Sequence, residues 1–253
     1  MAYGRPATHR LRPPVRRGTP VRLDAVRTTV AGVLLAAGEG SRFGQPKALV
    51  ELNGQTLAER GVGLLRAGGA DPILVVTGAV PLELDRTLTV DNPQWRTGMG
   101  SSLRAALQAL TEAGRGQDIG PEIGPEIGPE IGPEIGPEIG PEIGPGIGAV
   151  VVALADQPLV GAEAVARLIA AYRGGASVAV AAYDGQPRNP VLLAREHWPE
   201  VIATATGDQG ARTFLRTRPE LVTLVECGDT GRPDDIDTPA DLARITAEGT
   251  EDG

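Results

Sequence analysis

The chain has 253 residues, of which 41% are hydrophobic and only 3% aromatic, so small aliphatic side chains must fill the core of one large or two small domains. Its formal net charge of −8 argues against nucleic acid as the main partner. A single cysteine, Cys227, excludes an internal disulfide and fits a reducing compartment. No apolar run approaches the roughly 18 residues that would cross a membrane. We therefore expect a cytoplasmic protein without a membrane or nucleic-acid partner.

Two segments differ in composition from the rest of the chain. Residues 1–29 hold seven arginines and one acidic residue, with prolines wherever a helix might form and no apolar core of the kind that secretory signals have. Within residues 115–148, six Ile-Gly-Pro-Glu units follow one another, and proline at every fourth position excludes a helix or a central strand. We predict a disordered basic tail (1–29), a folded domain (30–247) carrying a low-complexity, dispensable insertion (115–148), and a short C-terminal tail (248–253).

The remaining sequence alternates between buried apolar runs and amphipathic runs. In chain order we predict a strand at 30–37, a helix at 56–69, strands at 72–78 and 88–92, a helix at 101–114, a strand at 149–158, a helix at 161–175, a strand at 176–185, a strand-to-helix turn at 188–198, a helix opening at 207–217, a strand at 221–229 and a loop with a last helix at 235–249. This alternation indicates an α/β fold, with a mainly parallel, Rossmann-like sheet and helices on both faces.

Polar clusters follow several of these predicted strands. They occupy residues 38–47, 91–102 and 156–158. Because ligands of open α/β sheets bind outside the carboxyl ends of the strands, we expect the three clusters to form one site.

The loop after the first strand is rich in glycine and carries two cations. It contains Gly38, Gly40 and Gly44 together with Arg42 and Lys47. Its spacing matches neither a Walker A loop nor a dinucleotide-binding fingerprint. Glycines let backbone N–H groups approach phosphate, and the two cations can neutralise a triphosphate and a departing pyrophosphate. The alternative is a glycine-rich turn with solvated cations.

The pattern L-A-A-G-x-G-x-R-x-G-x-P-K, ending at Lys47, resembles the signature loop of nucleotidyltransferases. Further stretches resemble the molybdenum cofactor cytidylyltransferases, which are MobA-like NTP transferases; they lie at 91–107, 153–160, 207–212 and 235–242. The resemblance covers nearly all of 30–247 except the insertion. It implies a nucleotide-diphospho-sugar-transferase type of fold and transfer of a nucleoside monophosphate, CMP from CTP being favoured, to a molybdopterin-type phosphate with release of pyrophosphate. The implied partners are the NTP, the phosphorylated acceptor, and a molybdoenzyme or maturation factor.

An acidic residue, Asp156, ends a buried apolar run, where an unpaired carboxylate would be costly. A hard cation such as Mg²⁺, with Mn²⁺ as a substitute, would explain it. By resemblance, Asp156 is the metal aspartate, Asp237 its partner and Asp235 the reserve candidate, while Lys47, Arg42 and Asp156 carry catalysis without a protein nucleophile. Asp156 and Asp237 could instead cap the helices that follow them.

The nucleobase is expected to contact the backbone of the first loop and the segment after residue 97. We assign it to Ala36, Ala37, Gly98, Ser101 and Ser102, and the two serines could equally serve as helix caps.

The acceptor is assigned to Arg188, Asn189 and Asp208, although Asp208 could merely cap a helix. The family usually has Gly-His-Pro where this chain has Arg188-Asn189-Pro190, which leaves the identity of the acceptor open.

Three alternatives remain open from the sequence. One is a nucleotidyltransferase with another base or acceptor. A second is an NAD(P)H-dependent enzyme of the nicotine blue oxidoreductase type, a name that some members of this family carry. The third is an inactive carrier of the cofactor. The lack of a dinucleotide-binding fingerprint and the presence of Lys47 and Asp156 favour phosphoryl chemistry over both of the latter readings.

Overall fold

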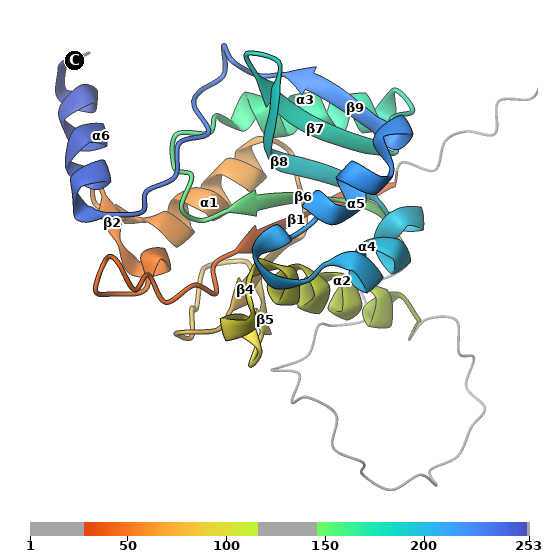
Figure 1. Cartoon of the computed structure of the whole chain (residues 1–253), viewed down its shortest axis with the longest axis horizontal. Coiled ribbons are helices and arrows are strands. Elements are labelled where there is room, and N and C mark those ends of the chain that lie inside the picture. Colours follow the sequence, from red (N-terminus) through yellow and green to blue (C-terminus); the bar gives the residue numbers. More distant parts are fainter. Residues whose placement is uncertain (1–27, 116–145, 252–253) are drawn as a thin grey trace, which may run out of the picture.

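The computed structural model describes residues 28–115 and 146–251. The predictions for residues 1–27, 116–145 and 252–253 lie outside the described residues. A seven-stranded sheet in the order β5-β4-β1-β6-β8-β7-β9 forms the centre of the molecule (Figure 1). The strands are β1 (Thr29–Leu35), β4 (Ile73–Thr77), β5 (Leu88–Asp91), β6 (Ile147–Leu154), β7 (Val178–Tyr183), β8 (Gln186–Ala194) and β9 (Val222–Glu226).

One strand of this sheet, β8, runs against the direction of the other six. It pairs antiparallel with β6 on one side and with β7 on the other, whereas β1, β4, β5, β6, β7 and β9 share one direction. The first residues of β8 therefore lie at the edge where the other strands have their carboxyl ends. The mainly parallel sheet predicted from the sequence is confirmed, and the reversal at β8 adds residues from an amino end to the functional edge.

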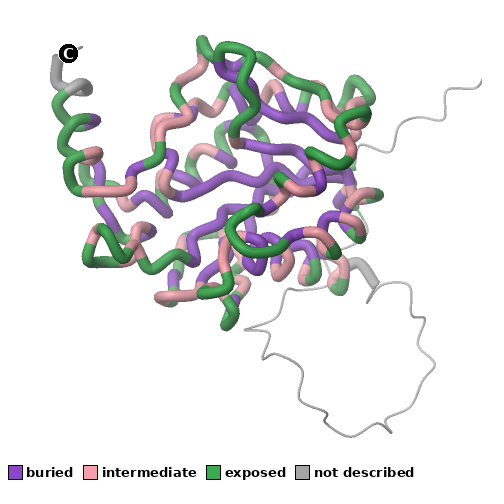
Figure 2. Tube along the Cα trace, in the orientation of Figure 1, coloured by how far each residue is buried: buried purple, intermediate pink, exposed green. Residues whose placement is uncertain are grey.

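Helices cover both faces of the sheet, which explains why its strands are apolar throughout (Figures 1 and 2). Alternate residues of each strand point to opposite faces, so Val33 belongs to one core cluster and Leu34 to the other. One face packs against α1 (Leu57–Ala67) and α3 (Ala162–Arg173). The other packs against α2 (Met99–Arg115), α4 (Trp198–Thr204) and α5 (Arg212–Thr217).

A smaller core lies beside the main one, where the last helix, α6 (Pro239–Glu251), approaches the short ribbon of β2 (Glu51–Leu52) and β3 (Gln55–Thr56). Val50, Leu52, Leu57, Ile236 and Ile245 form this cluster. It fixes the C-terminal segment against the chain that follows the glycine-rich loop.

Several boundaries differ from the sequence-based ones. Helix α2 begins at Met99, two residues before the predicted cap, because the preceding turn closes at Gly98 with φ of 106°. Strand β6 takes in Ile147 and Gly148 from the repeat, since Ile147 pairs with Thr29 of β1. Helix α6 continues to Glu251, past the predicted end of the domain. None of the helices in the described part of the chain has the length and apolar character needed to cross a membrane.

Candidate active site

The glycine-rich loop leaves the carboxyl end of β1 and turns sharply back on itself. Gly40 has φ of 62°, and a Cβ there would collide with the carbonyl oxygen of Gln45 and lie 2.9 Å from the backbone nitrogen of Lys47. Only glycine is tolerated at such a position. The turn directs the 3₁₀ segment Lys47–Leu49 back toward the sheet.

The side chain of Lys47 bridges two carboxylates. Its Nζ donates to Asp156 Oδ2 at 2.9 Å and to Asp237 Oδ1 at 2.5 Å. Burial disfavours the ammonium, but the charges and hydrogen bonds of the two aspartates outweigh this and raise the pKa of Lys47. Arg42 lies at the rim, 3.8 Å from Asp237 Oδ2 and 75% exposed. The structure therefore brings together the four charged residues predicted for the catalytic centre.

Backbone contacts hold the two aspartate segments side by side. The Ile236 N–H donates to the Asp156 carbonyl at 2.8 Å, and Gln157 Nε2 donates to Asp235 Oδ1 at 2.8 Å. Burial raises the pKa of Asp235, and its amide partner opposes that rise. Asp235 thus faces Gln157, whereas Asp237 faces Lys47.

Neither aspartate of the lysine bridge caps a helix. Thr238 and Asp241 form the hydrogen bonds at the start of α6, with Thr238 N–H donating to Asp241 Oδ2 at 2.8 Å. Gly161 precedes α3 without a side-chain bond. The capping alternative for Asp156 and Asp237 is therefore wrong.

The paired carboxylates suit a divalent cation. Asp156 and Asp237 converge on one point that already accommodates a positive charge. Among the described residues no cluster of three or more His, Cys, Asp or Glu side chains could hold a metal by itself. Two carboxylates completed by substrate phosphates are a typical Mg²⁺ site. When bound, such an ion supplies positive charge to phosphate oxygens.

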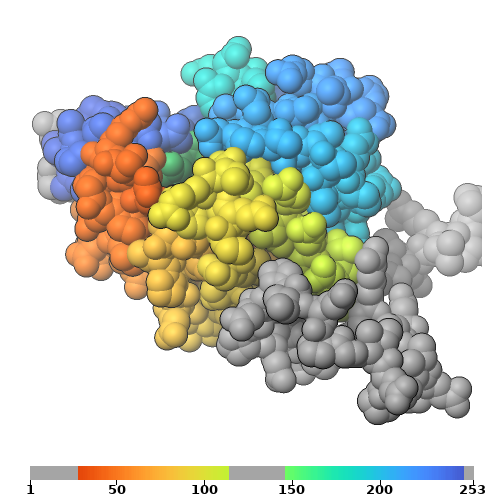
Figure 3. Space-filling model, turned by 60° about the horizontal axis from the view of Figure 1, so that its bottom comes forward, coloured from red at the N-terminus to blue at the C-terminus, as the bar shows by residue number. Residues whose placement is uncertain are grey.

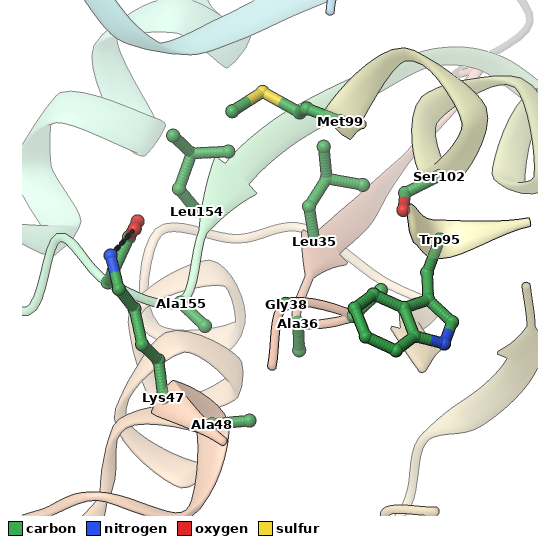
Figure 4. Close-up of a pocket in the computed structure, with 12 residues that line it drawn as sticks. Leu35, Ala36, Gly38, Lys47, Ala48, Trp95, Met99, Ser102, Leu154 and Ala155 are labelled. Atoms are coloured by element: carbon green, nitrogen blue, oxygen red, sulfur yellow. Dashed lines mark hydrogen bonds and ion pairs between the residues drawn. The ribbon is translucent and has the colours of Figure 1, made fainter. Parts of the chain in front are cut away.

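A cavity of about 140 Å³ opens beside Lys47 at the carboxyl ends of β1 and β6. Figure 4 shows Lys47 at one end, Trp95 at the other, and Leu35, Met99 and Leu154 between them. Of the predicted residues, the following line it: Ala36, Ala37, Gly38, Lys47, Ser102 and Asp156. Gly40, Gly98 and Ser101 do not line it and act instead on the turns around it.

The apolar lining was missed from the sequence, where Trp95 and Met99 lie inside the recognised stretch 91–107 but carry no charged group that would have singled them out. Arg96 lies 4.3 Å from the ring of Trp95 and holds that side chain in a cation–π contact.

Two buried serines stand at the start of α2. Asn92 Nδ2 donates to both hydroxyls, at 2.8 Å to Ser101 and 3.0 Å to Ser102. Ser101 donates to the carbonyl of Gly98 or Gln94, so it closes the turn and is not the N-cap. Ser102 faces the cavity (Figure 4). Of the pair, only Ser102 lines the cavity.

The backbone groups predicted to read the base are partly used by the fold. Ala36 N–H donates to the Val76 carbonyl at 3.0 Å, and the Ala37 carbonyl accepts from Ala79 at 3.1 Å. The Ala36 carbonyl and the Ala37 N–H are the groups left for a ligand.

Gly98 supports a second loop. A Cβ at Gly98 would lie 2.6 Å from Asp208 Oδ1 and would collide with the backbone of Gly207. The space-filling view shows the segment around residue 98 (yellow) against the segment around residue 208 (blue) (Figure 3). Asp208 therefore lies next to the turn before α2.

A larger cavity, of about 760 Å³, extends from Gln157 and Asp235 to α5 and β9. Arg188 and Asn189 line it, as do Arg212 and Arg216, which the sequence did not single out. Asp208, which was grouped with Arg188 and Asn189, is not among its lining residues. The reversed strand β8 is what brings Arg188 and Asn189 to this edge.

Residues 32–222 match the model of the MobA-like NTP transferase domain. The chain belongs to the MobA-like NTP transferase family. The resemblance stated from the sequence is confirmed at this level.

This MobA-like chain is similar to proteins that carry different functional names. It is 32% identical to a nicotine blue oxidoreductase of Paenarthrobacter nicotinovorans over 230 residues, 85% of this chain and 96% of the relative. It is 37% identical to a probable molybdenum cofactor guanylyltransferase of Opitutus terrae over 93 residues, 36% of this chain and 46% of the relative. A crystal structure from Mycobacterium sp. strain JC1, a homologue of a Mycobacterium tuberculosis protein, superimposes with a TM-score of 0.64 at 28% identity, covering 88% of this chain and 98% of that one.

Proposed function

We propose that this chain transfers a nucleoside monophosphate from an NTP to a phosphorylated acceptor and releases pyrophosphate. CTP is the favoured donor and a molybdopterin-type phosphate the favoured acceptor. The observation that carries the proposal is the bridge from Lys47 to Asp156 and Asp237 at the end of a cavity with an apolar lining. A flat base fits the apolar end, and the triphosphate fits the charged end.

The chemistry needs no protein nucleophile. An oxygen of the acceptor phosphate attacks the α-phosphorus, the bond between that phosphorus and the α–β bridging oxygen breaks, and pyrophosphate leaves with the electron pair. Lys47 and Arg42 stabilise negative charge that builds on the leaving oxygens. Asp156 and Asp237 would hold Mg²⁺ or Mn²⁺, and the fixed spacing of their segments orients the reacting groups.

The base would be selected by few polar groups. Trp95 offers an aromatic face, while the Ser102 hydroxyl, the Ala36 carbonyl and the Ala37 N–H offer hydrogen bonds. The preference for CTP rests on the resemblance of the sequence to the molybdenum cofactor cytidylyltransferases.

Pyrophosphate release tests the proposal directly. The protein is incubated with Mg²⁺, molybdopterin and each NTP in turn, beside Asp156→Ala. We expect release with CTP and its loss in the variant. Release with GTP alone would keep the reaction and overturn the choice of base. No release with any NTP, from a folded protein, would overturn the proposed function.

A second candidate is supported by the relative from Paenarthrobacter nicotinovorans, which aligns along 85% of this chain and is named nicotine blue oxidoreductase. Under this alternative the cavity beside Lys47 would hold NAD(P)H in place of an NTP. An assay of NADPH oxidation, measured by the absorbance of NADPH with a quinone-like dye as acceptor, distinguishes the two candidate functions. Dye reduction that survives Asp156→Ala would favour the oxidoreductase.

A further inference from the structure

The larger cavity concentrates three guanidinium groups. Arg188 enters it from the start of β8, and Arg212 and Arg216 from α5. None of the three lines the smaller cavity or contacts Lys47, Asp156 or Asp237 in the described structure. The molecule therefore has two separate cationic sets, one at each cavity.

The three arginines have no acidic partner in the part of the chain that the structure describes. No ion pair joins Arg188, Arg212 or Arg216 to a carboxylate within residues 28–115 and 146–251, and Arg188 donates only to the backbone carbonyl of Pro187 at 3.0 Å. The next arginine after α5, Arg218, behaves differently, since it pairs with Glu200 at 2.6 Å and Glu220 at 2.7 Å.

The one acid in the cavity lining, Asp235, accepts a hydrogen bond from Gln157 at 2.8 Å. Three guanidinium groups facing one carboxylate leave an uncompensated positive charge, which favours an anionic ligand.

The floor between these cations is apolar. Val180, Val191, Leu215, Val222 and Leu224 line the same cavity, and Leu224 is 50% exposed on the edge strand β9. Leu224 therefore adds exposed apolar surface to the cavity, which an apolar part of a ligand would cover favourably. The lining as a whole therefore suits a ligand with an apolar body and an anionic group.

We propose that Arg188, Arg212 and Arg216 bind an anionic group on the acceptor at the end remote from its reacting phosphate, so that the acceptor is anionic at both ends around an apolar body. The position assumed for the reacting phosphate rests on the proposed function, in which this phosphate lies at the lysine bridge. The arginine site itself rests only on the cavity. Arg212 and Arg216 are then specificity-determining residues for the acceptor.

A pair of fluorescent probes tests the site without any turnover. 1-Anilinonaphthalene-8-sulfonate is an aromatic anion, and N-phenyl-1-naphthylamine is its uncharged counterpart. We expect the double variant Arg212→Gln/Arg216→Gln to bind the sulfonate at least about tenfold more weakly, and the amine within about twofold of wild type. Arg212→Lys/Arg216→Lys keeps the charge and should retain most of the sulfonate binding, which separates loss of charge from loss of folding.

Two further variants locate the probe. Arg173→Gln removes an exposed arginine from the end of α3, on the opposite face of the sheet, and should change neither affinity. Arg42→Gln should also leave the sulfonate affinity unchanged. Equal losses for both probes in the double variant, no loss at all, or a loss in Arg42→Gln instead, would each overturn the site.

The outcome is separable from that of the proposed function. If the sulfonate affinity falls as expected while no NTP releases pyrophosphate, the anion site stands and the proposed reaction falls. If CTP is turned over and the double variant changes neither the sulfonate affinity nor the KM for the acceptor, the reaction stands and the anion site falls.

Discussion

The smaller cavity has a mainly apolar lining with Lys47 and Asp156 at one end, whereas three arginines from separate segments line the larger one. The first lies where β1 and β6 end, and its polar contacts come from groups that the backbone fixes. The second depends on the reversed strand β8, on α5 and on β9. The contrast indicates that the rigid sheet can bind the substrate shared by a family of enzymes, while side chains on more variable segments determine which second substrate is bound.

The largest expected effect concerns the smaller cavity. Asp156→Asn keeps the shape of the side chain but removes one negative charge from the lysine bridge. The same charge is lost from the two carboxylates proposed to hold the metal. We expect kcat/KM for nucleotidyl transfer to fall by about 10³-fold, with Tm nearly unchanged. Steady-state pyrophosphate release measures it. Asp229→Asn, which removes an exposed carboxylate paired with Arg167, serves as the control and should stay active.

Gly98→Ala tests whether the two cavities are mechanically linked. Gly98 has φ of 106° and ψ of 174°, a conformation essentially limited to glycine, and it seats the segment 207–208 that leads into α5. We expect a loss of about 2 kcal/mol in unfolding free energy and an increase of about tenfold in the KM for the acceptor. Urea unfolding and acceptor titration measure these effects.

Gly63→Ala is the matched control for that substitution. Gly63 is exposed inside α1 with open space around its Cα, so alanine should stabilise the protein by about 0.5–1 kcal/mol. An acceptor KM that stays at the wild-type value in Gly98→Ala would show that the cavities act independently.

Arg42→Gln tests the contribution of the arginine at the rim of the smaller cavity. Because Arg42 is 75% exposed and only 3.8 Å from Asp237, its contribution should be small and sensitive to salt. We expect the KM for the NTP to rise by about threefold to tenfold at low salt and the difference to shrink near about 0.5 M salt. A difference that is independent of ionic strength would mean that Arg42 bonds the nucleotide from a desolvated position.

The smallest effect concerns the start of α6. The Thr238 hydroxyl, together with backbone N–H groups, lowers the pKa of Asp241 below its usual 3.8. A lowered pKa stabilises the folded state above the unfolded value, and this contribution disappears as the pH falls through the folded value. Asp241→Asn should therefore lower Tm by about 2–4 °C at pH 7 and by progressively less below about pH 4. Thermal scans across pH 2–7 measure it, and a pH-independent difference would contradict the assignment.

The sequence predicted one cavity far better than the other, for a physical reason. Lys47, Gly38 and Ala36 are neighbours in the chain, so a single loop pattern indicated their chemistry. Arg188 and Arg212 become neighbours only through a strand that reverses the sheet direction and a helix of six residues. Periodicity gives no sign of such a reversal.

Smaller elements escaped prediction for a related reason. The ribbon of β2 and β3 has two residues in each strand, too few for alternation to be visible. The sequence left Asp237 as either a metal ligand or the cap of α6, whereas in the structure Thr238 and Asp241 form the hydrogen bonds at the start of that helix. The lysine bridge explains why Asp237 has another role.

The place where the repeat joins the fold has an evolutionary consequence. Helix α2 ends at Arg115 and strand β6 begins at Ile147, both at the edge of the sheet opposite to Lys47 and Asp156. Tandem repeats gain and lose whole units readily through replication slippage. Because both ends of the repeat attach at this edge, we expect such changes in copy number to leave the register of β6 against β1 intact.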